Sequence, residues 1–165
     1  MPVPLLERLE RDGLLKKGTG SFAGHAPPHL EILQLCHRGV LEGGLSVALD
    51  VRADELLGPL CQAVGGSAKR LRIVDVRDRP VMEVRIQYGD VEEPWELEDL
   101  YALVQNLNDL LKGDRQAAAI AILGEWEDML QLWCVRKDAL GRILRQDYFA
   151  PRNRHQLEGL LRPAR

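Results

Sequence analysis

The spacing of apolar residues along the chain first predicts helices. Residues 53–64 place apolar side chains at helical spacing, and Gly65-Gly66 follows as a helix stop. A longer helix is predicted over residues 95–112. Glu92-Glu93-Pro94 precedes it, and acidic residues and proline favour a helix start. Shorter helices are predicted over residues 3–17 and 155–161.

Alternating and β-branched apolar runs predict the strands. Residues 45–49 alternate, and two pairs of strands joined by turns follow, over 69–77 with 80–88 and over 117–123 with 130–135. The sequence also allows a short strand over residues 141–145. Residues 30–42 fit a buried strand or a helix, because so short a run has no decisive period. Strands joined by short turns form an antiparallel sheet that helices must cover, so the predicted class is α+β.

Glycine and proline mark the predicted domain boundary. Residues 18–29 carry three glycines and the pair Pro27-Pro28, a composition typical of a linker. We therefore expect an N-terminal helix and flexible arm over residues 1–44, followed by a core domain over residues 45–165.

The order of elements from residue 53 resembles that of the type III secretion chaperones and the YbjN family. The most local similarity is the segment Leu100-Tyr101-Ala102-Leu103-Val104-Gln105-Asn106-Leu107-Asn108, a helix ending in Leu-Asn just before a strand. In that family, helices flank a twisted antiparallel sheet and the molecules pair as dimers. The family usually has three strands before the middle helix, whereas two are predicted here. The resemblance implies a chaperone-like or adaptor role without catalytic residues.

Two other folds fit the same pattern. A Roadblock-like domain would use residues 141–145 as a third strand before the last helix. A ferredoxin-like fold would use residues 45–124 as a βαββαβ unit.

Charge is segregated along the chain. Residues 90–128 hold eleven acidic and two basic side chains, a net charge of −9, whereas residues 133–165 hold eight basic and three acidic ones, a net charge of +5. The acidic region would face a partner protein or the basic region within a dimer. Glu92, Glu93 and Glu96 are the predicted protein-binding residues there.

The helix over residues 95–112 also suggests a homodimer. At 100° per residue, its apolar side chains span about half the circumference, more than one sheet covers. Leu103 and Leu110, at the edge of this arc, are the predicted interface residues. The alternative cover is residues 1–41 of the same chain.

The basic C-terminal region suggests a second function. Arg142, Arg145, Arg152 and Arg154 surround Tyr148 and Phe149, and charge beside exposed aromatic rings is typical of nucleic-acid binding. Alternatively, the two rings anchor the last helix and the arginines are solvated. The acidic sequence pI of about 5.8 favours this second interpretation.

No enzyme or cofactor site is expected. His25, His29, Cys36 and His37 lie close in sequence, but Pro27-Pro28 prevent one helix from presenting the first two, and the four-ligand pattern of structural zinc is missing. Gly18–Gly24 lacks the strand, helix and lysine of a phosphate-binding loop. Cys36, Cys61 and Cys134 suit reduced core thiols. With no signal peptide or membrane span predicted, the expected location is the cytoplasm.

Overall fold

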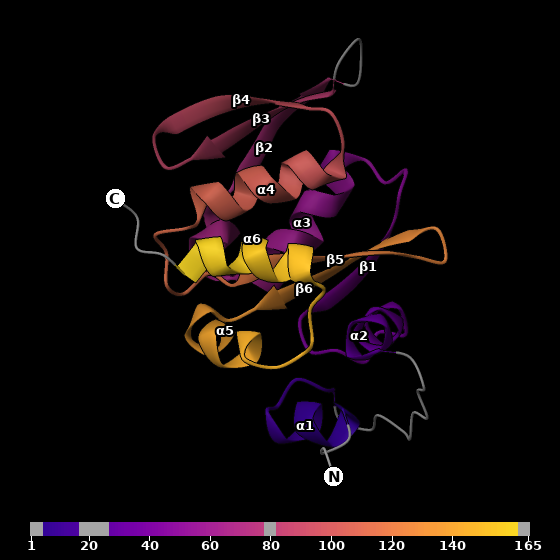
Figure 1. The fold of residues 1–165 in the computed structure, drawn as a ribbon. Helices are drawn as coiled ribbons and strands as arrows, with labels where there is room; N and C mark the ends of the chain where they lie inside the picture. The colour runs from indigo at the N-terminus through magenta and orange to yellow at the C-terminus, as the bar shows by residue number, and fades with distance from the viewer. Residues whose placement is uncertain (1–4, 17–26, 78–81, 162–165) are drawn as a thin grey trace.

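A computed structural model describes residues 5–16, 27–77 and 82–161. Helices and strands alternate irregularly along it (Figure 1). In chain order they are α1 (Leu5–Arg11), α2 (Pro28–His37), β1 (Gly44–Ala48), α3 (Ala53–Val64), the 3₁₀ turn η1 (Gly66–Arg70), β2 (Arg72–Arg77), β3 (Met82–Tyr88), β4 (Val91–Leu97), α4 (Leu100–Leu110), β5 (Ala119–Trp126), β6 (Met129–Val135), α5 (Lys137–Leu144) and α6 (Pro151–Leu161).

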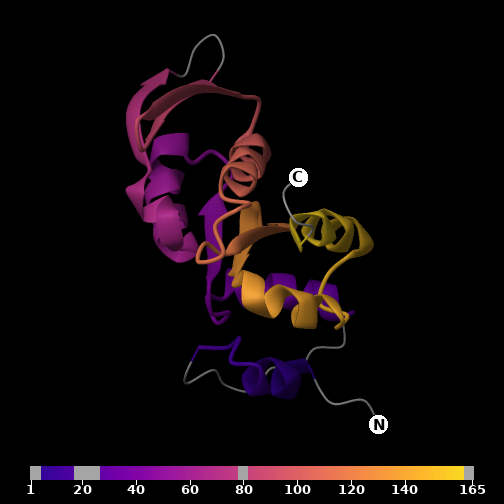
Figure 2. The same ribbon diagram turned by 90° about the vertical axis from the view of Figure 1, so that its left-hand side faces the viewer.

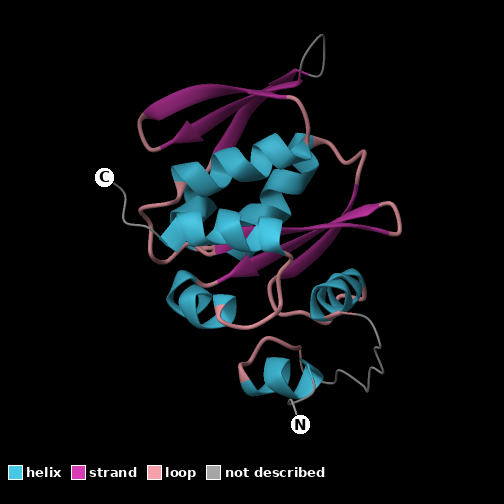
Figure 3. Cartoon of the chain, in the orientation of Figure 1, coloured by secondary structure: helices cyan, strands magenta, loops and turns pink. Residues whose placement is uncertain are grey.

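The described strands form two antiparallel sheets of three strands each, in the orders β1-β6-β5 and β2-β3-β4 (Figure 3). The α+β class is therefore confirmed, whereas a single sheet is wrong. The ferredoxin-like alternative fails with it, because β1 pairs with β6 and not with β2 or β3.

Strand β4 replaces the predicted start of the long helix. Gly89 and Asp90 form a two-residue turn from β3, with Gly89 at a φ of 58°, so the chain returns directly along β3. Trp95 and Leu97 then alternate into the core. Helix α4 begins only at Leu100, after the Asp99 carboxylate accepts a hydrogen bond from the Ala102 N–H at 3.0 Å.

Helix α4 packs its apolar face into the molecule, so Leu103 is not available as the expected interface residue. The sheet β2-β3-β4 lies over α3 and α4 (Figure 2), and β5 contacts the other side of α4. Leu103 is completely buried and Leu110 is half-buried in one core formed by these elements. The wide apolar arc is therefore covered by the chain's own two sheets, and neither a second subunit nor residues 1–41 are needed for it.

A second core lies on the opposite face of the sheet β1-β6-β5. Along β5, side chains enter the two cores alternately, which explains its unbroken apolar sequence. Helices α1 and α2 contribute Leu5, Leu9, Ile32 and Leu35 to this second core. The described parts of residues 1–44 thus belong to the folded body. Residues 18–26 of the expected arm lie outside the described residues.

Helix α5 occupies the segment where the sequence allowed a strand. Leu140, Ile143 and Leu144 are buried at helical spacing. The Roadblock-like alternative required a strand at residues 141–145 and is therefore wrong. None of the described helices has the length and apolar character that a membrane span requires.

Candidate functional site

Strand β4 and its flanking turns carry a row of carboxylates along the chain, which we call the acidic edge. Within the described residues β4 pairs only with β3, so it lies at the edge of its sheet. All members of the row are exposed: Asp90, Glu92, Glu93, Glu96, Glu98 and Asp99. The structure thus brings Glu92, Glu93 and Glu96, predicted from sequence, onto one accessible strand.

Only part of this negative charge is compensated within the chain. Arg85 on β3 lies 3.4 Å from Glu92, and Glu93 accepts a hydrogen bond from the Trp95 indole at 3.3 Å. Glu96 lies directly opposite Glu83 in the strand register. Glu83 itself is paired with Arg85, whose Nε lies 3.9 Å from a Glu83 carboxylate oxygen. No lysine or arginine occurs between Arg85 and Lys112.

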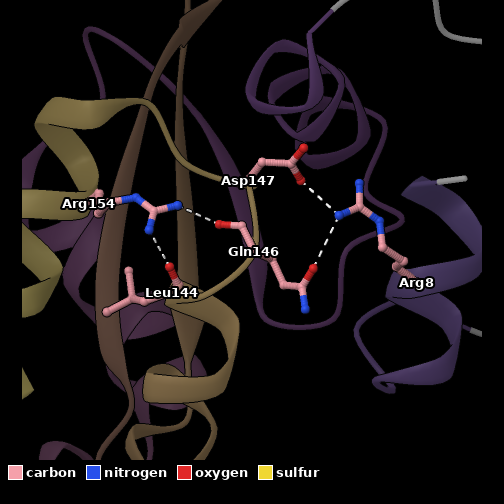
Figure 4. Close-up of polar contacts among 5 residues, drawn as sticks. All are labelled: Arg8, Leu144, Gln146, Asp147 and Arg154. Atoms are coloured by element: carbon pink, nitrogen blue, oxygen red, sulfur yellow. Dashed lines mark hydrogen bonds and ion pairs between the residues drawn. The ribbon is translucent and has the colours of Figure 1, made fainter. Parts of the chain in front are cut away.

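Of the predicted nucleic-acid residues, Arg142, Arg145 and Arg152 are exposed, whereas Arg154 is partly buried and engaged within the chain. Arg154 donates to the backbone carbonyls of Leu144 and Gln146 at 2.5 Å each, so its guanidinium holds the end of α5 (Figure 4). Tyr148 and Phe149 are buried, and the Phe149 ring lies 5.6 Å from that of Trp133. The interpretation of the two rings as anchors is confirmed, and no ring remains for base stacking in this region.

A groove of about 450 Å³ lies beside α5. Its walls come from the turn after α1, the turn before β1, the end of α3, the segment before β5, the end of β6 and one face of α5. Its lining includes Leu14, Glu42, Trp133, Val135, Arg142 and Ile143. Of the predicted site residues, Arg142 alone lies in this groove. Its lining mixes apolar and charged side chains, as ligand-binding grooves commonly do.

The thiols of the described residues are unsuited to nucleophilic chemistry. All three cysteines are buried and free, as expected for core thiols. Burial raises the pKa of the Cys36 and Cys61 thiols to about 11 and that of Cys134 to about 12, so each stays protonated at neutral pH.

The histidine and cysteine cluster is dispersed as well. Cys36 and His37 end helix α2, and the His37 Nδ1 lies 3.3 Å from the Ser46 hydroxyl. His25 lies outside the described residues. Across residues 5–16, 27–77 and 82–161, no three metal-binding side chains come together.

Comparison of the chain with protein-family models, curated proteins and solved structures finds no match.

Proposed function

We propose that this chain is a non-enzymatic adaptor or chaperone-like protein that binds a basic segment of another protein through the acidic edge. The observation that carries this proposal is the group of six exposed carboxylates on the edge strand β4 and its two flanking turns, of which three lie on the strand itself. Counted from residue 53, where the resemblance begins, three strands precede α4, the number usual in the family that the sequence resembles, although here they form a sheet of their own.

Binding at the acidic edge would use side chains rather than backbone pairing. Pro94 lies in the middle of β4 and has no N–H to offer a further strand. Charges and proline on an edge strand also discourage uncontrolled strand addition. A partner would therefore approach with lysine or arginine side chains. Such contacts contribute orientation and association rate, and added salt weakens them.

Homodimerisation and nucleic-acid binding are not included in this proposal. The apolar arc that suggested a dimer is buried within the chain. Arg154 and the rings of Tyr148 and Phe149, on which the nucleic-acid hypothesis depended, make contacts within the chain instead.

Titration with a defined basic peptide tests the proposal. The probe is a fluorescent ten-residue peptide with six lysines, followed by anisotropy at low salt. We expect the variant Glu92→Lys/Glu93→Lys/Glu96→Lys to bind it at least about 10-fold more weakly than the unmodified chain, because several charge contacts become repulsive. The variant Glu55→Lys/Glu127→Lys/Glu158→Lys changes the net charge equally at exposed sites off the acidic edge, and should weaken binding much less. Equal losses in both variants would contradict a specific role for the acidic edge.

A further inference from the structure

Helix α1 lies at the end of the molecule opposite β4, beyond α2 and α5 (Figures 1 and 2). It is a single short helix that buries Leu5 and Leu9 in the second core. The chain then turns at Gly13, which has a φ of +72° and open space around it. Leu15 next forms a bridge with Leu41. This order allows α1 to leave its position by rotation at Gly13 while the bridge is kept.

Among the described residues, the side-chain polar contacts between α1 and the rest of the chain are made by Arg8. Its Nη1 donates to Asp147 Oδ1 at 2.8 Å and to Gln146 Oε1 at 3.2 Å (Figure 4). The guanidinium carbon also lies 5.4 Å from the centre of the Tyr148 ring, within range of a cation–π contact. Arg154 holds the same loop from the other side, so the groups that receive Arg8 are fixed by residues outside α1.

The contact around Arg8 is incomplete. Among the described residues, three buried side-chain polar atoms have no hydrogen-bond partner, and two of them, Arg8 Nε and Tyr148 Oη, belong to this contact. A buried donor without an acceptor weakens the packing that encloses it. The contact of α1 with the rest of the chain therefore leaves two buried polar atoms without hydrogen bonds. This lowers the free energy needed to displace the helix.

The groove beside α5 continues from this position. Its wall includes Asp12, Gly13 and Leu14, the turn that directly follows α1. Rotation of α1 at Gly13 would open that wall and expose part of the second core beside Asp147. The result would be a longer groove, with the apolar second core at its floor and charged side chains, Asp147 among them, along its rim, the kind of site that binds one face of an amphipathic helix.

We propose that the position of α1 is a binding site for an amphipathic helix of a partner protein, and that α1 occupies it as an internal competitor. The ligand chemistry follows from α1 itself: apolar side chains at positions i and i+4, as in Leu5 and Leu9, with an arginine at i+3, as in Arg8. This inference rests on the proposed function, since both describe a protein-binding molecule, but it uses a different surface.

The test measures peptide binding to the full chain after the charges of residues 8 and 147 are reversed, in the peptide or in the chain. The probes are fluorescent peptides of residues 4–14, one with the natural sequence and one with Arg8→Glu. The natural peptide should bind the full chain carrying Arg8→Glu at least about 10-fold more tightly than the unmodified chain, because that substitution repels α1 from Asp147. The Arg8→Glu peptide should in turn bind a chain carrying Asp147→Lys and not the unmodified chain.

Each other outcome overturns the proposal. Equal binding of the natural peptide to the unmodified and Arg8→Glu chains would show that α1 does not compete. Absence of the exchanged specificity with Asp147→Lys would show that Asp147 does not select the ligand. Loss of cooperative thermal unfolding in both variants would make α1 an integral part of the fold. A dimer of the unmodified chain that Arg8→Glu dissociates would make a second copy the occupant.

Failure of this inference can be distinguished from failure of the proposed function, because the lysine peptide binds at the acidic edge, at the opposite end of the molecule from α1. Its binding by the Arg8→Glu chain should equal that by the unmodified chain.

Discussion

Asn108 is the polar residue that joins the long helix to the central sheet. Its side-chain amide donates to the Ile120 carbonyl at 3.0 Å and accepts from the Ile120 N–H at 2.9 Å, at the edge of β5. Both backbone groups are buried, so no water replaces a lost partner. We predict that Asn108→Ala lowers the free energy of unfolding by about 2 to 4 kcal/mol. Gln105→Ala, an exposed change on the same helix, should lower it by less than about 0.5 kcal/mol in the same urea titration. Similar values for both would contradict the role of Asn108.

Asp114 gives the folded chain a specific dependence on acid. Hydrogen bonds from the Ser67 hydroxyl and N–H, and from the Gln116 N–H at 2.9 Å, lower the pKa of its carboxyl to about 2 from the ordinary 3.8. The stabilisation is thus complete above about pH 4 and disappears as the pH falls towards 2.

We predict that Asp114→Asn destabilises the chain at neutral pH by about 1 kcal/mol. The difference from the unmodified chain should shrink between pH 4 and pH 2, as measured by urea unfolding at each pH. Ser67→Ala removes the largest cause of the shift and should show the same trend. A difference that stays constant down to pH 2 would contradict this account.

At the scale of elements, Gly43 determines how closely β1 approaches β6. A Cβ added there would lie 2.4 Å from the Cys134 carbonyl oxygen, in a backbone conformation with a φ of +83°. Gly39 has a similar φ of +75° but open space around it. We predict that Gly39→Ala costs about 1 kcal/mol from backbone strain alone. Gly43→Ala should cost a further 1 to 3 kcal/mol or so from the collision. If both variants lose the same stability in thermal unfolding, the close approach at Gly43 does not contribute to the free energy of unfolding.

The elements that the sequence predicted well have local causes. Helix α3 has the predicted bounds because its apolar spacing and the glycine at its end, Gly65 with a φ of 72°, are both local signals. Strand β4 was missed because Glu92-Glu93-Pro94 resembles a helix start. The decisive signal was the two-residue turn Gly89-Asp90, which joins β4 to a strand already predicted.

The long-range arrangement could not be predicted in the same way. Strand β1 pairs with β6, which lies more than eighty residues later in the chain. Neither strand has a sequence feature that indicates which strand it pairs with. The same limit applies to the sites. Exposure of Glu92, Glu93 and Glu96 follows from their charge, whereas the contacts of Arg154 and of Arg8 depend on residues that only the fold brings near.

At the scale of the whole molecule, the surface argues against self-association. The large apolar side chains exposed among the described residues are few and lie in separate segments of the chain: Leu49, Val74, Val91 and Leu161. We predict a monomer by analytical ultracentrifugation at high micromolar concentration. Leu103→Glu should unfold this monomer rather than dissociate a dimer, because Leu103 is completely buried. A concentration-dependent dimer would contradict the prediction.

Binding of a partner at the acidic edge is tested most directly by quantitative affinity capture from a nuclease-treated native lysate. The baits are the unmodified chain, the variant Glu92→Lys/Glu93→Lys/Glu96→Lys, and the charge-matched variant Glu55→Lys/Glu127→Lys/Glu158→Lys. If the acidic edge binds the partner, a protein enriched by the unmodified chain is retained by the charge-matched variant, lost by the acidic-edge variant and released by salt. Equal enrichment of the same proteins by all three baits would contradict the claim.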